Sequence, residues 1–432
     1  MKTTSPEISV RHSVTPWAWV PSLYFGEGIP YVVVMTLAVV MYKNLGVSNT
    51  DIALYTGWLY LPWVIKPLWA PVVDRFRTKR FWIISLQFVI GVTLALVALT
   101  VPGPGFFRAT LAVFWLMAFS SATHDIAADG FYLLALPSHQ QAAYVGVRST
   151  FYRLAMICGQ GGLVYLAGHL QTTWGNIPRA WSAVFWLVAG FFGLIGAYHL
   201  LVLPKPAGDH AVKGGKRFFA DFLRVFMEFF RKKDIGKILG FLLLYRFAEA
   251  QLLKLVTPFL LDSRSAGGLG LGTEQVGIIY GTVGVIALTI GGLVGGVAIS
   301  RCGLKRLLWP MIVTMHAPNA LFVFLAIAQP ANPYLIGGVM AVEQFGYGFG
   351  FAAYLLYVMM VADGEHKTAH YALCTGFMAL GMMLPGMAAG WIQEQLGYRD
   401  FFIWICVATL LPFAAAMPVK IDPAYGKKAA GR

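Results

Sequence analysis

The chain has 432 residues, of which 58% are hydrophobic and 12% are charged, and its mean hydropathy is +0.67. This composition excludes a soluble globular enzyme or binding domain and is typical of an integral membrane protein. The formal charge of +14 comes from short segments between apolar runs rather than from a compact basic domain, so we expect no nucleic-acid partner.

Apolar runs long enough to cross about 30 Å of hydrocarbon follow one another along the chain. The first run is too long for the apolar region of a cleaved signal peptide, so we expect it to remain in the protein. We therefore predict an all-α membrane protein whose partner is the lipid bilayer. Its twelve transmembrane helices are expected at residues 17–42, 52–70, 81–101, 109–135, 141–168, 180–203, 238–261, 274–299, 307–328, 334–361, 370–391 and 400–418.

The lysines and arginines outside these runs are distributed unevenly between the two sides of the membrane. If both termini and the alternate loops are assigned to the cytoplasm, that side carries 23 basic residues and the opposite loops carry five. Cytoplasmic loops collect lysine and arginine, so both termini are expected in the cytoplasm.

The chain divides into two predicted six-helix halves, residues 1–204 and 238–432, joined by a basic linker at 205–237. Basic turns after the second span of each half, at 74–80 and 301–306, support an internal repeat. Phenylalanines recur at helical spacing within the linker, which suits a helix on the inner membrane surface, although a plain tether stays open. The four cysteines are scattered, so we expect no metal site, disulfide framework or cofactor.

The few charged residues predicted inside the bilayer fall on every third span. A charge at mid-bilayer costs roughly 3 kcal/mol or more, so such residues usually face a protein interior or a wet cavity. One shared central cavity, and hence a solute transporter, is the simplest explanation of the pattern. The residues are Glu27 on the first span, Asp125 and Asp129 on the fourth, Arg246 and Glu249 on the seventh, and Glu343 on the tenth.

Proton coupling requires a buried group whose protonation changes as the site opens and closes. Glu27 and Asp125 are favoured. Gly26 and Gly28 flank Glu27 and Pro30 follows, a combination that breaks helices and can expose backbone groups to a cavity. A static pairing of Glu27 with a basic neighbour such as Arg153 stays open. The complete set of candidates for coupling is Glu27, Asp125, Glu249 and Glu343.

Spans four and five form a hairpin, so residues equally far from its loop lie at similar depth. Asp125 is then level with Arg153, and Asp129 with Arg148, and two ion pairs are predicted, either static or part of coupling. Arg246 and Glu249 are three residues apart on one helix face and can pair as well.

If Arg246 is free, its guanidinium suits a carboxylate or phosphate on the solute. Sugar rings commonly stack on aromatic faces, so tyrosines on these spans add to the expected site, although packing is the ordinary role of a membrane aromatic. The candidate solute-binding residues are Tyr24, His124, Tyr152, Arg153, Arg246, Gln344 and Tyr347.

Three motifs carry a family resemblance: K-x-L-W-x-P-x-x-D-R at 66–75, S-A-x-x-D-I-x-x-D at 121–129, and Y-R-L at 152–154. The chain resembles the major facilitator superfamily, and within it the AmpG-type muropeptide permeases, a branch that also includes acetyl-CoA transporters. The resemblance implies two six-helix repeats that rock about a mid-membrane site in a bacterial inner membrane. It also implies proton-coupled import of an anhydromuropeptide or another oligosaccharide or glycoconjugate.

A siderophore or another small metabolite is the alternative cargo that the resemblance leaves open. The turn at Asp74 and Arg75 resembles the superfamily's gating loop, and Lys66 belongs to the same motif. With Asp129 and Arg148, these residues form the expected gating or structural set. We expect the protein to function as a monomer whose partners are a small-molecule solute and protons.

No nucleotide-binding loop is evident, because Thr273 stands where a phosphate-binding lysine would be needed after the glycine-rich segment 267–272. An ATP-driven pump is therefore not expected. Two other classes stay open: a membrane enzyme built on His124, Asp125 and Asp129, and a sensor that binds a solute without transporting it.

Overall fold

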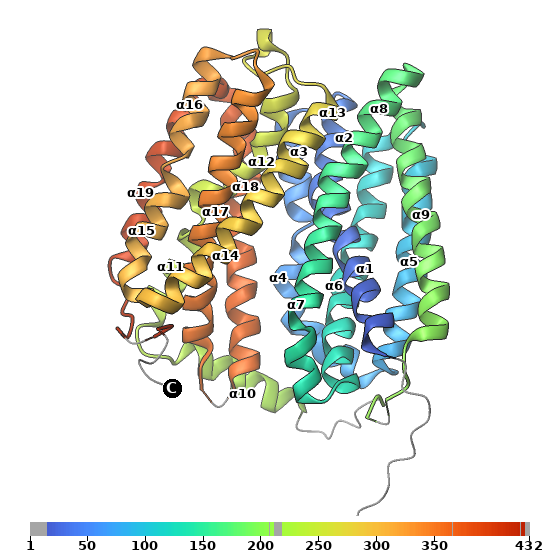
Figure 1. Cartoon of the computed structure of the whole chain (residues 1–432), viewed down its shortest axis with the longest axis vertical. Helices are drawn as coiled ribbons and strands as arrows, with labels where there is room; N and C mark the ends of the chain where they lie inside the picture. The colour runs from blue at the N-terminus through green and yellow to red at the C-terminus, as the bar shows by residue number, and fades with distance from the viewer. Residues whose placement is uncertain (1–14, 207, 211–217, 365, 424, 428–432) are drawn as a thin grey trace, which may run out of the picture.

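The computed structural model describes residues 15–206, 208–210, 218–364, 366–423 and 425–427, and all the regular elements in these ranges are helices. Two bundles lie side by side, one formed by the first part of the chain and one by the last part (Figure 1). The helix α10, Phe218–Phe230, lies across one end of the molecule. We call this the linker end and the opposite one the far end.

The first bundle opens with a short turn, η1 (Pro16–Ala18), and then contains spans one to six. Three of these spans are broken or carry a π-helical segment. The elements are α1 (Val20–Val32), η2 (Val33–Leu37), α2 (Ala38–Asn44), α3 (Asn49–Trp58), α4 (Leu61–Arg75), α5 (Lys79–Thr100), α6 (Phe106–Ala135), α7 (Ser138–Ile157), η3 (Cys158–Leu163), α8 (Val164–Trp174) and α9 (Ile177–Val202).

The second bundle contains spans seven to twelve. Its elements are α11 (Ile235–Leu244), α12 (Phe247–Leu261), η4 (Arg264–Ala266), α13 (Thr273–Val276), η5 (Gly277–Gly284), α14 (Val285–Cys302), α15 (Leu304–His316), α16 (Asn319–Ala328), α17 (Pro333–Ala362), α18 (Lys367–Ala408) and α19 (Leu410–Ala416).

Within the described residues, eight helical segments are long and apolar enough to cross a membrane. One of them, Ala369–Ala416, holds two crossings that turn at Gly397, where φ is +74°. Three more segments complete the twelve predicted spans: the broken helices α3–α4 and α11–α12, and the polar α7–η3–α8. These three are less regular or more polar, and they bring most of the basic residues that line the central cavity.

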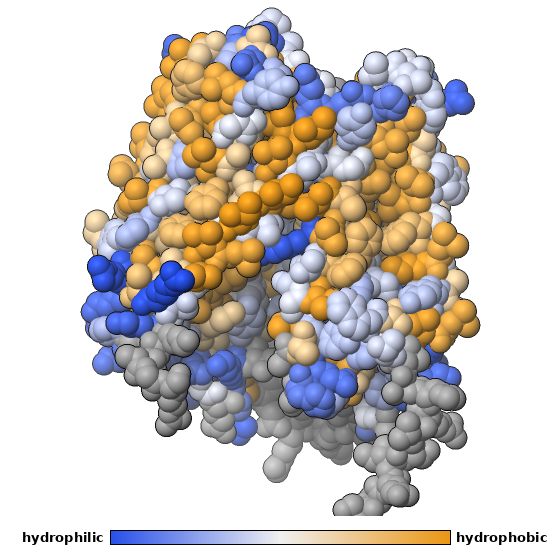
Figure 2. Space-filling view, in the orientation of Figure 1, coloured by the Kyte–Doolittle hydropathy of each residue, from blue (hydrophilic) through white to orange (hydrophobic). Residues whose placement is uncertain are grey.

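Each bundle packs its own apolar core, and large apolar side chains cover the outside. Leu194 and Leu201, for example, are 74% and 84% exposed, which suits contact with lipid rather than water. On the face shown in Figure 2, apolar residues predominate across the middle of the molecule and hydrophilic residues gather toward both ends. This surface agrees with a multi-pass membrane protein.

The linker helix docks on the second bundle. The ring of Phe229 is fully buried and stacks on Phe377 of α18, and the carboxylate of Glu228 lies 3.3 Å from the ring of His366. A helix is therefore present where the sequence predicted one. The structure does not describe the side chains of residues 218–223, which include three of the phenylalanines of the linker.

The two bundles meet closely at the far end. Lys43 Nζ lies 2.6 Å from Asp262 Oδ1, and the Tyr398 hydroxyl donates to Asp262 Oδ2 at 2.6 Å. Asn49 Nδ2 donates to Gln393 Oε1 at 2.7 Å and to the Tyr398 hydroxyl at 2.9 Å. We call these five residues the far-end network, and they join helices of both bundles. Toward the linker end the space-filling view is hollowed between the bundles (Figure 2).

Glycines allow the backbones of η3 and η5 to touch across the two bundles. A Cβ added to Gly281 would collide with the carbonyl group of Gln160. We expect Gly281→Val to lower the free energy of unfolding by about 1–3 kcal/mol, because backbone cannot move aside as a flexible side chain can. Thermal unfolding of the purified protein in detergent measures the effect as a lower Tm.

The matched control is Gly296→Val on the same span, where an added Cβ meets no atom within 4 Å. Both variants place a β-branched residue in a helix, so their difference isolates the contact between the bundles. Equal Tm values for the two variants would contradict this account of Gly281.

Candidate solute-binding cavity

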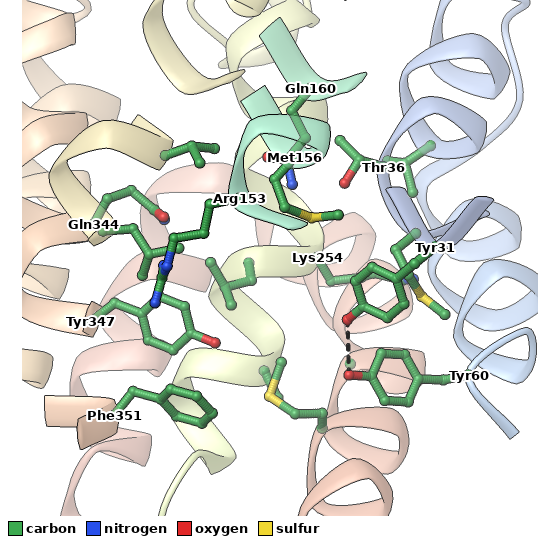
Figure 3. A pocket seen from close by; sticks show the side chains of 18 of the residues that line it. Tyr31, Thr36, Tyr60, Arg153, Met156, Gln160, Lys254, Gln344, Tyr347 and Phe351 are labelled. Atoms are coloured by element: carbon green, nitrogen blue, oxygen red, sulfur yellow. Dashed lines mark hydrogen bonds between the residues drawn. The ribbon is translucent and has the colours of Figure 1, made fainter. Parts of the chain in front are cut away.

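A cavity of about 650 Å³ lies between the two bundles and draws its walls from both of them. This volume falls within the range of sites that hold small-molecule ligands. Its polar and aromatic lining is Tyr24, Glu27, Tyr31, Thr36, Tyr60, Arg148, Ser149, Tyr152, Arg153, Gln160, Arg246, Lys254, Thr257, Tyr280, Gln344, Tyr347 and Phe351. Figure 3 shows several of these side chains directed into the same space.

Three cations in the lining have no carboxylate partner among the described ion pairs. Arg153 Nη1 donates to Thr289 Oγ1 at 3.3 Å, across the bundle boundary. The guanidinium of Arg246 donates to the Tyr347 hydroxyl and lies 4.8 Å from the ring centroid of Phe351. Together with Lys254, these groups give the cavity positive charge on both of its walls.

Aromatic side chains line the same space from both bundles. The Tyr31 and Tyr60 hydroxyls lie 3.1 Å apart, and the ring of Tyr31 meets Trp63 edge-on at 5.3 Å between centroids. Tyr347 and Phe351 lie opposite, beside Arg153 and Gln344 (Figure 3). The cavity can therefore offer flat apolar faces and hydrogen-bonding groups to one solute.

The predicted pair of Asp129 and Arg148 is confirmed, with Arg148 Nη2 2.7 Å from Asp129 Oδ1. Tyr24 completes the cluster, because its hydroxyl donates to Asp129 Oδ1 at 3.4 Å and its ring centroid lies 4.5 Å from the Arg148 guanidinium.

The predicted pair of Asp125 and Arg153 is wrong. Asp125 Oδ2 instead accepts a hydrogen bond from Trp63 Nε1 at 3.0 Å and lies 3.6 Å from Lys66 Nζ. Equal distance from the hairpin loop sets depth but not direction. Arg148 and Arg153 are five residues apart and therefore about 140° apart around their helix, so they cannot both face α6.

Glu27 lines the cavity on the first bundle. Its Oε2 is buried and has no hydrogen-bond partner among the described residues, and Glu27 forms no ion pair with Arg153 there. A static bridge between these two residues is therefore not the arrangement of this state.

Glu249 of α12 and Glu343 of α17 lie behind the cavity wall, fully buried in the second bundle. Both carboxyl oxygens of Glu249 and Oε1 of Glu343 are buried and accept no hydrogen bond from the described residues, and Gln344 Nε2 donates to Glu343 Oε2 at 2.9 Å. The possible pair of Arg246 with Glu249 does not form, because the Arg246 side chain turns to Tyr347 and Phe351.

His124 does not line the cavity, contrary to its expected part in solute binding. Its ring is buried inside the first bundle and lies 3.2 Å from the side-chain amide of Gln87. His124, Asp125 and Asp129 thus turn to three different sets of partners. This arrangement weighs against the alternative of an enzyme that uses the three as one cluster.

The expected gating turn is described only in part. Arg75 is exposed at the end of α4, and the side chain of Asp74 lies outside the described side chains. Lys66, from the same motif, lies beside Asp125 rather than at the cavity wall.

The sequence analysis did not predict several residues that line the cavity, although helical spacing indicates some of them. Tyr31 is seven residues after Tyr24, and Arg246, Ala250 and Lys254 recur at intervals of four, so each set follows one helix face. Lys254 points into the cavity beside Tyr31 (Figure 3). No local pattern singles out Tyr60, Gln160 or Tyr280.

Comparisons with known proteins agree with this arrangement. The sequence profile described as Major Facilitator Superfamily matches residues 22–367. The chain is 27% identical to the anhydromuropeptide permease of Escherichia coli (strain K12) over 396 residues, covering 90% of this chain and 76% of the permease. It is also 27% identical to an uncharacterized protein of Haemophilus influenzae over 403 residues, covering 90% of each.

Solved structures share the fold at low sequence identity. A point mutant of the nucleoside transporter NupG matches with a TM-score of 0.72 at 16% identity, covering 93% of this chain and 99% of that one. A bacterial homologue of the human lysosomal transporter Spinster, in an inward-facing and unoccupied conformation, matches with a TM-score of 0.68 at 15% identity, covering 94% and 96%.

Proposed function

This chain belongs to the Major Facilitator Superfamily, and from that premise we propose that it imports an anionic muropeptide or a related glycoconjugate together with protons. The observation that carries the proposal is the set of three cations, Arg153, Arg246 and Lys254, that line one cavity without carboxylate partners. A buried charge without a counter-charge is costly, so an anionic solute would stabilise this site.

The tyrosines of the cavity support a sugar-containing solute. Tyr31 and Tyr60 on one wall and Tyr347 on the other offer ring faces and hydroxyl groups to a pyranose and its substituents. The similarity to a protein named anhydromuropeptide permease points to the same class of solute.

The linker end is proposed to face the cytoplasm, with both termini on that side. The far-end network then closes the outer entrance, and the cavity is open to the cytoplasm. Import requires the bundles, proposed as residues 1–204 and 238–432, to rock about the cavity until the far end opens and the linker end closes. We further propose that one monomer suffices, because the cavity lies within a single chain.

Proton coupling is proposed to use the buried carboxyl groups of Glu27, Asp125, Glu249 and Glu343. Asp129 and Arg148 neutralise each other at 2.7 Å and are assigned a structural or gating part instead. A siderophore or another small anionic metabolite remains the second candidate cargo, because the same three cations would bind its carboxylates.

Uptake into proteoliposomes under an imposed pH gradient tests the function. We expect labelled anhydromuropeptide to accumulate when the interior is alkaline and to stop accumulating when an ionophore collapses the gradient. A neutral disaccharide should not accumulate, because it offers the cations no counter-charge. Accumulation of a siderophore but not of the muropeptide would identify the siderophore as the transported solute. Binding of a solute without its accumulation would support a sensor.

A further inference from the structure

Glu27 is the one acid among the described residues that line the cavity. The residue is 6% exposed, and its buried Oε2 accepts no hydrogen bond from any described residue. A buried carboxylate without a partner is costly, because it has lost its water and gained neither a donor nor a counter-charge. The first bundle therefore presents an unsatisfied acceptor to whatever fills the cavity.

The packing of α1 turns this acceptor toward the cavity. Tyr24, Glu27 and Tyr31 follow one another at intervals of three and four residues, so they share a helix face, and all three line the cavity. A Cβ added to Gly28 would lie 2.7 Å from Ala155 Cβ, so the neighbouring face of α1 packs closely on α7. This contact holds the first span in the rotation that places Glu27 at the cavity wall.

Two basic residues of the first bundle already pair with other acids. Lys66 Nζ lies 3.6 Å from Asp125 Oδ2, and Arg148 Nη2 lies 2.7 Å from Asp129 Oδ1. None of the ion pairs among the described residues includes Glu27. The carboxylate of Glu27 is therefore left without a counter-charge from its own bundle.

The opposite wall of the cavity has the opposite character. Arg246 and Lys254 come from the second bundle, and the guanidinium of Arg153 reaches that bundle at Thr289, 3.3 Å away. One wall thus offers cations without carboxylate partners, and the other offers a carboxylate without a cationic partner. A solute that satisfies both walls carries an anionic group and, apart from it, a cationic group.

Tyrosines flank Glu27 on its wall. The hydroxyl of Tyr24 donates to Asp129 at 3.4 Å, and the hydroxyl of Tyr31 lies 3.1 Å from that of Tyr60, as Figure 3 shows. These hydroxyls are engaged elsewhere, but the rings still line the cavity. Aromatic faces attract cations, so a carboxylate between tyrosines favours a protonated amine over a neutral hydroxyl group.

We propose that Glu27 binds a protonated amino group of the solute and thereby selects zwitterionic solutes over purely anionic ones. This inference rests on the proposed function and narrows its solute class. The carboxylate accepts N–H hydrogen bonds from the ammonium, while Arg246 binds an anionic group of the same solute across the cavity. Glu27 is then a determinant of specificity.

Two solutes that differ only at the amino group test this role. The first is labelled anhydromuropeptide with a free amino group in its peptide, and the second is the same compound acetylated at that group. In titration calorimetry at neutral pH, the wild type should bind the free amine roughly 10- to 100-fold more tightly, which is the range of a charge-assisted hydrogen bond.

The variant Glu27→Gln should bind the two compounds with similar affinity, because glutamine keeps the size of the side chain but not its charge. A penalty from the bulk of the acetyl group would persist in this variant. A role of Glu27 in proton coupling alone would lower accumulation and leave the preference for the amine intact. That preference, if it persists in Glu27→Gln, would overturn the inference, as would equal binding of the two compounds by the wild type.

Two further variants sharpen the result. Glu27→Asp retains the negative charge on a shorter side chain and should keep part of the preference for the amine. Asp400→Asn removes an acid that pairs with Arg399 and has a side chain 46% exposed, so it should leave the preference unchanged.

If the wild type binds neither form of the muropeptide, the proposed cargo is wrong, and a second pair of probes then tests the inference. The dipeptide alanylglutamate and its N-acetylated form are compared by thermal unfolding of the purified protein at equal concentrations. The free dipeptide should raise the Tm of the wild type more than the acetylated form does, and this difference should vanish in Glu27→Gln. Equal Tm values with the two dipeptides in the wild type would overturn the inference.

Discussion

Replacing Arg246 by glutamine is expected to weaken binding of labelled anhydromuropeptide by roughly 10- to 100-fold. A hydrogen bond to a charged group contributes about 1.5–3 kcal/mol, and Arg246 is only 5% exposed and directed along the cavity wall toward Tyr347 and Phe351. Titration calorimetry on the purified protein measures the change in Kd. Arg246→Lys keeps the positive charge and should lose less affinity than Arg246→Gln, because the lysine still attracts an anionic group although it lacks the paired donors of the guanidinium.

The control for this experiment is Arg399→Gln, which removes an exposed arginine whose partner is the adjacent Asp400. It should leave the Kd unchanged. If Arg246→Gln binds as tightly as the wild type, Arg246 is a packing residue of the aromatic wall and the anionic-solute proposal loses its main support in the second bundle.

Replacing Asp262 by asparagine is expected to increase the population that is open at the far end. Lys43 and Asp262 are 14% and 19% exposed at their side chains, so breaking the pair leaves a largely buried ammonium without its counter-charge. With a discount for partial exposure, the cost is about 1–3 kcal/mol, which shifts the conformational equilibrium by roughly 5- to 150-fold.

Spin labels at Thr173 and Ser265, exposed positions on opposite bundles, report this change. Asp262→Asn should add a population with a longer distance between the labels than the wild type shows. Exchanging the charges, with Lys43→Asp and Asp262→Lys together, should restore part of the short distance. An unchanged distribution in Asp262→Asn would mean that packing alone, such as the contact of Gly281 with η3, closes the far end.

The sequence predicted the fold well because membrane spans obey a strong local rule. Backbone groups in lipid must be satisfied within a helix, so length and hydropathy predict each crossing with little reference to tertiary contacts. The spans least regular in the structure, such as α11–α12 with its break before Phe247, were still detected from their apolar runs. The turn at Gly397 was likewise expected between two runs.

The candidate site was predicted in part. Among the predicted residues, Arg153, Arg246, Gln344 and Tyr347 line the cavity. Polar side chains in a membrane protein tend to face a cavity or the protein interior, because contact with hydrocarbon is costly for them. His124 shows the limit of that reasoning. A buried side-chain amide, Gln87, satisfies one of its ring nitrogens inside the first bundle, and nothing in the spacing of residues 87 and 124 reveals the contact.

Pairings across helices were the least accessible from the sequence. The sequence indicated the depth of Asp129 and Arg148 along their hairpin, and this pair forms. It did not indicate the rotation of α7 about its axis, so the partner predicted for Asp125 was wrong. The hydrogen bond from Asn49 Nδ2 to Gln393 Oε1 joins residues 344 positions apart, and only the packing of α3 against α18 brings them together.

The amino-acid order was thus sufficient for the class of protein, the number of crossings and the buried charges that a transporter needs, because each of these follows from the cost of placing polar groups in hydrocarbon. The tertiary arrangement alone decided which charges pair with each other, which ones face the cavity, and at which end polar contacts join the two bundles. Those outcomes depend on the rotation and crossing of helices, and side chains distant in sequence set both through packing.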